Sequence, residues 1–66
     1  MDREKIGDVL RVARTGLNLT QSELSGLVGI SRNYISDIEN GRYTPSFETL
    51  IKVTNQLEID LNTLTS

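Results

Sequence analysis

The sequence predicts an all-α protein, organised as one compact domain of five short helices that spans residues 1–66. Apolar residues recur at helical spacing, and no stretch alternates apolar and polar residues as a strand does. Helix-start residues and turn residues divide the chain at short intervals. Because a chain of 66 residues buries only about 60% of the surface exposed on unfolding, its core depends on good helix packing or on a partner subunit.

The first helix is predicted over residues 4–17. One stripe with i, i+4, i+7 and i+11 spacing contains its apolar residues Ile6, Leu10, Ala13 and Leu17. Asn18 tolerates left-handed backbone geometry, so we expect the helix to end there.

Four capping residues predict the starts of the remaining helices. We expect these helices at 21–28, 32–39, 47–57 and 61–65, and their N-caps are Thr20, Ser31, Ser46 and Asp60. Thr20 and Glu23 have the spacing of a capping box. Gly29 separates the second helix from the third, and Asn40–Gly41 ends the third.

The second and third helices are short and only about three residues separate them. Such a connection forces a steep crossing, as in a helix-turn-helix unit. Gly29 supplies the conformational freedom for the turn, and Ile30 fills the angle between the helices. Gly26 lies within the second helix, where glycine costs roughly 1 kcal/mol against alanine, and we interpret it as a site of close packing.

Three motifs together resemble the Cro and phage-repressor type of helix-turn-helix domain: Thr20–Ser25, Gly29–Ser31 and Ile35–Gly41. The similarity extends over roughly residues 6–64, since Ile6–Gly7, Arg14 and Pro45–Ser46 also fit it. Asn18 stands where the family usually has glycine, and Ser25 where it usually has alanine. The resemblance implies a lambda repressor-like fold with its helix-turn-helix motif at about 20–40 and its third helix in the major groove of DNA.

The outer face of the third helix is polar. At about 100° per residue, Ile35 and Ile38 point inward together, and the opposite side carries Asn33, Ser36, Asp37 and Asn40, with Arg32 at its flank. Arg32 suits guanine, Asn33 suits adenine and Asp37 can accept from cytosine, while Ser36 is adaptable. These four are the predicted base contacts; a merely solvated polar face is the alternative. For Asp37, the further alternative is an ion pair with Arg32 or Arg11.

Seven further residues are predicted to contact the DNA phosphates: Thr20, Gln21, Ser22, Tyr34, Asn40, Arg42 and Tyr43. Gln21 opens the second helix, where free backbone amides favour a phosphate. The resemblance implies the same role for Arg42 and Tyr43, and the alternative for them is a solvated turn. For Thr20 and Ser22 the alternative is ordinary capping, and for Tyr34 it is partly buried packing.

Arg14 and Glu39 flank the core faces of their helices. Glu39 projects only about 40° from Ile35 on the helical wheel, too close to the core for an isolated charge. The resemblance implies that the two form a buried structural ion pair between the first and third helices.

The C-terminal region, residues 47–66, is the predicted dimer interface. Leu50, Val53 and Leu57 form the inward stripe of its first helix, with Phe47 beside them. The predicted interface residues are Ile51, Leu57, Ile59, Leu61 and Leu64. The alternative is that these residues close the core of the monomer.

Composition excludes several classes of protein. The chain has no cysteine and no histidine, so we expect no disulfide, no metal site, no cofactor and no Ser-His-Asp or Cys-His catalysis; an enzyme is not expected. The charged start at residues 1–5 does not suit a signal peptide, and no apolar run has membrane length, so a cytoplasmic protein without membrane contact is expected.

The sequence thus predicts a transcriptional regulator, a repressor or controller, that binds a palindromic duplex operator as a homodimer. The formal net charge of −2 opposes this prediction, because DNA-binding modules are usually basic. The acidic excess follows residue 43, however, in the part expected to lie away from the duplex. The alternatives are a protein-interaction module such as an antitoxin or anti-repressor, and a DNA-binding domain excised from a longer regulator.

Overall fold

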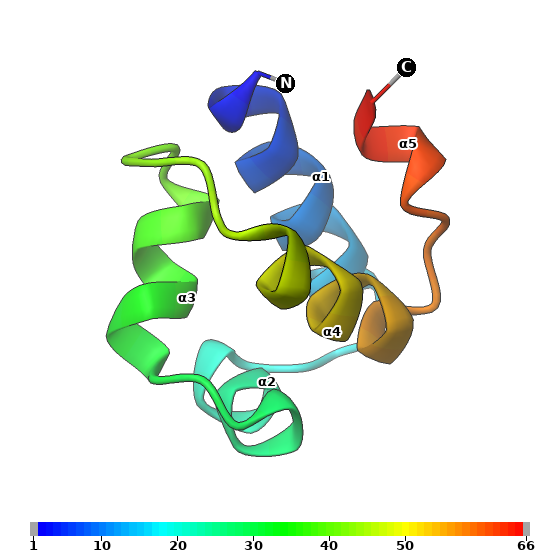
Figure 1. The fold of residues 1–66 in the computed structure, drawn as a ribbon. Helices are drawn as coiled ribbons and strands as arrows, with labels where there is room; N and C mark the ends of the chain where they lie inside the picture. Colours follow the sequence, from blue (N-terminus) through cyan, green and yellow to red (C-terminus); the bar gives the residue numbers. More distant parts are fainter. Residues whose placement is uncertain (1, 66) are drawn as a thin grey trace.

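The computed structural model describes residues 2–65, which form five α-helices and no strand (Figure 1). The helices are α1 (Arg3–Gly16), α2 (Gln21–Val28), α3 (Arg32–Glu39), α4 (Phe47–Leu57) and α5 (Asn62–Thr65). The all-α prediction is therefore confirmed; α1 is shifted by one residue and α5 begins one residue late. Met1 and Ser66, the ends of the predicted domain, lie outside the described residues.

Side-chain caps account for the helix starts. The Thr20 hydroxyl accepts from the Glu23 amide at 3.0 Å, and the Glu23 carboxylate accepts from the Thr20 amide at 2.8 Å, which completes the predicted capping box. The Ser31 and Ser46 hydroxyls cap α3 and α4 by accepting from the Tyr34 and Thr49 amides at 3.1 and 3.2 Å, without the reciprocal carboxylate of a capping box. Gly29 ends α2 at a φ of 71°, in the left-handed region.

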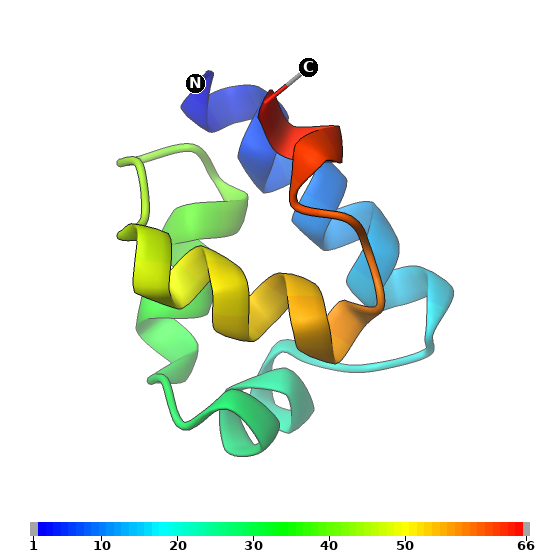
Figure 2. The same cartoon turned by 45° about the vertical axis from the view of Figure 1, so that its right-hand side comes forward.

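The helices surround one apolar core. α1 packs against α3, α4 and α5, and α2 packs against α3 and α4. In Figure 2, α4 crosses the molecule from the side of α3 toward the segment that leads to α5. The core residues are Ile6, Leu10, Leu24, Ile35, Ile38, Leu50, Val53, Leu57 and Leu64.

Gly7 allows α1 and α3 to approach closely. A Cβ atom at this position would lie 2.6 Å from the carbonyl oxygens of both Ile38 and Glu39. No side chain fits at that distance, so the contact between the two helices requires glycine at position 7.

Three packing predictions were wrong. Leu17 is 42% exposed, because α1 ends at Gly16 and the apolar stripe stops before it. Phe47 is 62% exposed, because it shares the outward i, i+4 stripe of α4 with Ile51 rather than the inward stripe of Leu50. Beyond the backbone of its own helix and its two chain neighbours, no atom lies within 4 Å of a Cβ placed on Gly26, so this glycine is not a site of close packing.

Candidate nucleic-acid interface

α3 presents its polar face to solvent, as its periodicity predicted. Ile35 and Ile38 are each 2% exposed, so they anchor the inner face. Arg32 and Asn33 are exposed in the first turn, and Ser36 and Asp37 are partly exposed one turn later. The four residues predicted to read bases therefore project from one side of a short helix that the core holds in place.

Asp37 does not stand alone on this face. Its Oδ1 atom lies 3.1 Å from Nη1 of Arg42, and its Oδ2 accepts from the Tyr43 hydroxyl at 3.4 Å. The ring of Tyr43 stacks on that of Tyr34, with centroids 5.4 Å apart. We call Tyr34, Asp37, Arg42 and Tyr43 the Asp37 cluster.

Asp37 does form an ion pair, but not with either of the partners considered from the sequence. Its partner is Arg42, from the loop after α3, rather than Arg32 or Arg11; Arg11 is bonded to Asp8 at 3.5 Å. Tyr34, which is partly buried, packs against Tyr43. Desolvation, and then the nearby Asp37 carboxylate, raise the pKa of Tyr43 above its ordinary value, and the Tyr43 hydroxyl donates to Asp37.

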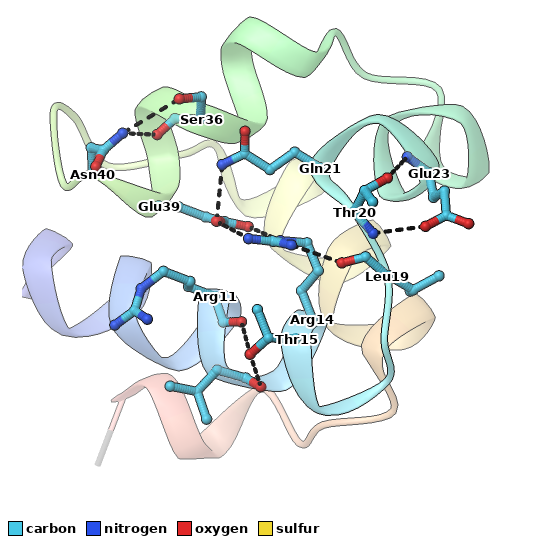
Figure 3. Close-up of polar contacts among 11 residues, drawn as sticks. Arg11, Arg14, Thr15, Leu19, Thr20, Gln21, Glu23, Ser36, Glu39 and Asn40 are labelled. Atoms are coloured by element: carbon cyan, nitrogen blue, oxygen red, sulfur yellow. Dashed lines mark hydrogen bonds and ion pairs between the residues drawn. The ribbon is translucent and has the colours of Figure 1, made fainter.

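Behind the polar face, Arg14 and Glu39 form the expected ion pair between α1 and α3 (Figure 3). Arg14 Nε and Nη2 donate to the two carboxylate oxygens at 2.7 and 2.9 Å, and Nη1 donates to the Leu19 carbonyl at 2.7 Å. The side chains are only 11% and 3% exposed. The hydrogen bond to Glu39 raises the pKa of Arg14, against the lowering effect of burial, so the guanidinium stays charged.

Gln21 joins this buried pair to the surface. Its Nε2 donates to Glu39 Oε1 at 3.1 Å, so the side chain at the start of α2 is held against α3 (Figure 3). One amide hydrogen is used in this bond, and the primary amide carries a second. The sequence linked Arg14 to Glu39 only through a resemblance, and it offered no signal for the bond from Gln21.

The remaining predicted phosphate contacts differ in how they are held. Thr20 caps α2, which was the alternative for it, whereas Ser22 is exposed. The Asn40 side chain donates to the Ser36 carbonyl at 2.9 Å and approaches its hydroxyl at 3.4 Å, so it folds back along α3 (Figure 3). Arg42 is the cation of the Asp37 cluster, and its side chain is 68% exposed.

The predicted dimer surface divides into buried and accessible residues. Leu57 and Leu64 are 3% and 2% exposed, so they close the core of the monomer and are not available to a partner. Ile51 is 38% exposed, and Ile59 and Leu61 are half-buried. Phe47, which the sequence analysis placed at the core, adds a large exposed ring to the stripe of Ile51.

Within residues 2–65, no group of three or more acidic side chains is arranged to hold a metal ion. A helix of the length and apolarity needed to cross a bilayer is likewise not found in this part of the chain.

Comparison with known proteins identifies the family. A helix-turn-helix family model matches residues 10–64. The ImmF control region 10 kDa protein of Bacillus phage phi105 is 42% identical over 64 residues, which cover 97% of this chain and 71% of that protein. The transcriptional regulator ClgR of Mycobacterium tuberculosis is 42% identical over 60 residues, but these span only 54% of its length and 91% of this chain.

Solved structures have the same fold. The restriction-modification controller protein C.AhdI from Aeromonas hydrophila aligns with a TM-score of 0.88 at 33% identity and covers 96% of both chains. The biofilm regulator SinR, solved in complex with DNA, aligns with a TM-score of 0.86 at 31% identity and covers 92% of this chain and 98% of its own. The family match, the shared fold and the relatives, which are regulators rather than enzymes, show that this chain belongs to the helix-turn-helix family.

Proposed function

We propose that the chain is a sequence-specific transcriptional regulator that binds duplex DNA with α3 in the major groove. The observation that carries this proposal is the two-sided character of α3, whose inner face is held in the core and whose outer face is polar and accessible. Relatives named as repressors and regulators, and the similar fold of SinR in complex with DNA, support it.

Base readout is assigned to the first turn of α3. Arg32 and Asn33 are exposed there, and their side chains suit guanine and adenine. Ser36 adds an adaptable donor and acceptor one turn later. A bidentate contact contributes roughly 1–3 kcal/mol of discrimination, so Arg32→Ala should relax the preference at one base pair of the operator.

Phosphate contacts are assigned to both ends of the helix-turn-helix motif. At the start of α2, Gln21 is held by Glu39, and the backbone amides of the first turn favour an anion. After α3, Arg42 presents an exposed guanidinium. These contacts give affinity and register rather than sequence preference.

We further propose that two copies bind a palindromic operator. The longest dimension of one chain is 27 Å, which is shorter than the roughly 34 Å between successive major grooves on one side of B-DNA. The accessible candidates for the interface are Phe47 and Ile51, which are exposed, and Ile59 and Leu61, which are half-buried. Sedimentation should show a dimer that Ile51→Glu shifts toward monomer; an unchanged dimer would place the interface elsewhere.

The compartment that fits this function is the cytoplasm, where a regulator of a bacterial or phage genome meets its operator. The acidic balance favours a second candidate, a protein-interaction module that keeps the fold but does not need the DNA-facing residues. The formal net charge of −2 is its only support.

Selection from random duplexes, followed by salt titration of the best site, separates the two candidates. The proposal expects an enriched palindrome with half-sites about one turn apart and an affinity that falls steeply with salt. An Arg32→Ala variant should lose the preference, whereas Lys52→Ala, on α4, should keep it. Weak and sequence-blind binding by the wild-type chain would favour the interaction module.

A further inference from the structure

The Asp37 cluster places a carboxylate on the face where the duplex is proposed to lie. An unpaired carboxylate there would repel phosphates, and from the sequence Asp37 was predicted to contact cytosine. In the structure both of its oxygens are engaged, Oδ1 by the Arg42 guanidinium and Oδ2 by the Tyr43 hydroxyl. Each oxygen can accept a second hydrogen bond, but the two bonds direct the carboxylate toward Arg42 and Tyr43 in the loop after α3.

The two hydrogen-bond donors of the Asp37 cluster, Tyr43 and Arg42, differ in how many N–H or O–H groups remain for a phosphate. A phenol has one hydrogen, and that of Tyr43 goes to Asp37, so its hydroxyl cannot also donate to a phosphate. A guanidinium has five N–H groups, and the bond to Asp37 engages one of them. Since the Arg42 side chain is 68% exposed, the other donors of the guanidinium can meet a phosphate without breaking this bond.

Two further contacts hold the loop to α3. The Arg42 backbone amide donates to the Asp37 carbonyl at 3.0 Å. The stacked rings of Tyr34 and Tyr43 join the helix to the residue after Arg42. The guanidinium is thus tied to α3 by its own side chain, by its backbone and through its neighbour.

Resting on the proposed function, we infer that Asp37 is a positioning residue that orients Arg42 toward a DNA phosphate beside the recognition helix. It does not read cytosine. Tyr43 supports this arrangement instead of contacting the phosphate itself. Orienting a flexible arginine before binding reduces the side-chain entropy lost on the DNA, so the carboxylate helps binding in spite of its charge.

A double-mutant cycle tests this inference on the duplex selected by the wild-type chain. Dissociation constants are measured for wild type, Asp37→Ala, Arg42→Gln and the double variant. Loss of Asp37 removes a repulsive charge in either background, but it removes the orientation of Arg42 only where Arg42 is present. The relative weakening caused by D37A should therefore be about threefold to fivefold larger with Arg42 than in the R42Q background, the upper range for an exposed ion pair.

Two controls accompany the cycle. Asp37→Asn keeps one oxygen for Arg42 and should restore part of the coupling. Glu58→Gln removes one negative charge at the C-terminal end of α4, which lies away from α3 in Figures 1 and 2, and should show no coupling to R42Q. Alanine favours the interior of α3, so circular dichroism of D37A should show a folded chain.

Each other outcome overturns the inference. Equal ratios in the two backgrounds, with a changed base preference, would make Asp37 a base reader. A smaller ratio with Arg42 present would mean that Asp37 withholds Arg42 from the phosphate. If the wild-type chain selects no duplex, the proposed function itself fails; if it selects one and the ratios are equal, only the role of Asp37 fails.

Discussion

Two carboxylates on α3, two residues apart, show how position decides the role of a charge. Glu39 is 3% exposed and binds Arg14 through both oxygens, and Gln21 shares one of them. Asp37 is 31% exposed and binds an arginine that is 68% exposed. Because neighbours two apart on a helix point about 200° from each other, one short helix carries a pair that holds the fold and a pair that faces solvent.

The two ion pairs should therefore differ in what their loss changes. Removing one partner of a buried pair strands a charge, which is strongly destabilising. An exposed pair contributes little to stability, because water solvates its charges almost as well. We therefore expect loss of the Glu39 pair to lower the free energy of unfolding, and loss of the Asp37 pair to change the affinity for DNA.

The largest effect is expected from Glu39→Ala. It leaves the Arg14 guanidinium buried without its carboxylate, and we expect a loss of about 3–5 kcal/mol in the free energy of unfolding. Urea denaturation followed by circular dichroism measures it. Asp37→Ala is the matched control, with an expected change below about 1 kcal/mol. Similar losses from the two variants would contradict the comparison.

The second prediction concerns the backbone contact behind Glu39. Gly7→Ala forces a Cβ to 2.6 Å from two α3 carbonyl oxygens, so the helices must separate. We expect a loss of about 1–3 kcal/mol, as for overpacked cores. Gly26→Ala meets open space and should instead stabilise the chain by about 0.5–1 kcal/mol. A tolerated G7A variant would show that α1 and α3 are loosely packed.

The sequence predicted the helices and the buried Glu39 side of α3 better than the exposed Asp37 side. A helix cap depends only on hydrogen bonds between residues a few positions apart. The capping residues Thr20, Ser31 and Ser46 were therefore sufficient to predict where α2, α3 and α4 begin. The inward direction of Glu39 followed from its spacing to Ile35, although its pairing with Arg14 came from the family resemblance.

The contacts of the exposed side of α3 depend on how the loop after α3 folds back, which no local sequence pattern predicts. The Asp37 partner is Arg42 because the chain turns at Gly41, with a φ of 69°, and folds the loop back onto α3. The role of Gly7 likewise requires the relative placement of α1 and α3. Phe47 is apolar and lies near the core stripe in sequence. Whether it is buried depends on which elements pack on that side of α4, and in the structure it is exposed.

The third prediction moves to the exposed pair. Arg42→Gln removes one proposed phosphate contact, so we expect weaker binding to all duplexes alike and a salt slope smaller by about one unit. The free energy of unfolding should change by less than about 1 kcal/mol. Titrations on the selected site and on an unrelated duplex check both expectations. A loss confined to the selected site would indicate that Arg42 reads a base.

The smallest effect is expected at Tyr43. In a Tyr34→Phe variant, Tyr43 is the remaining tyrosine of the two in the chain, so ultraviolet absorbance follows its ionisation alone. Its pKa should lie above that of a free tyrosine, and Asp37→Ala should lower it only in part, because desolvation is the larger cause. Since the folded-state pKa is raised, the associated stabilisation is present below the unfolded pKa and is lost as pH rises through the folded pKa. An ordinary pKa would mean that the cluster does not persist in solution.

Amide chemical-shift mapping with the selected duplex tests the central claim most directly, that DNA lies on the outer face of α3. We expect the largest shifts at Arg32, Asn33 and Arg42 and at the first turn of α2, with small shifts in α5. Perturbations concentrated on α1 and α5, with α3 unchanged, would contradict it and would assign the partner surface to the opposite side of the molecule.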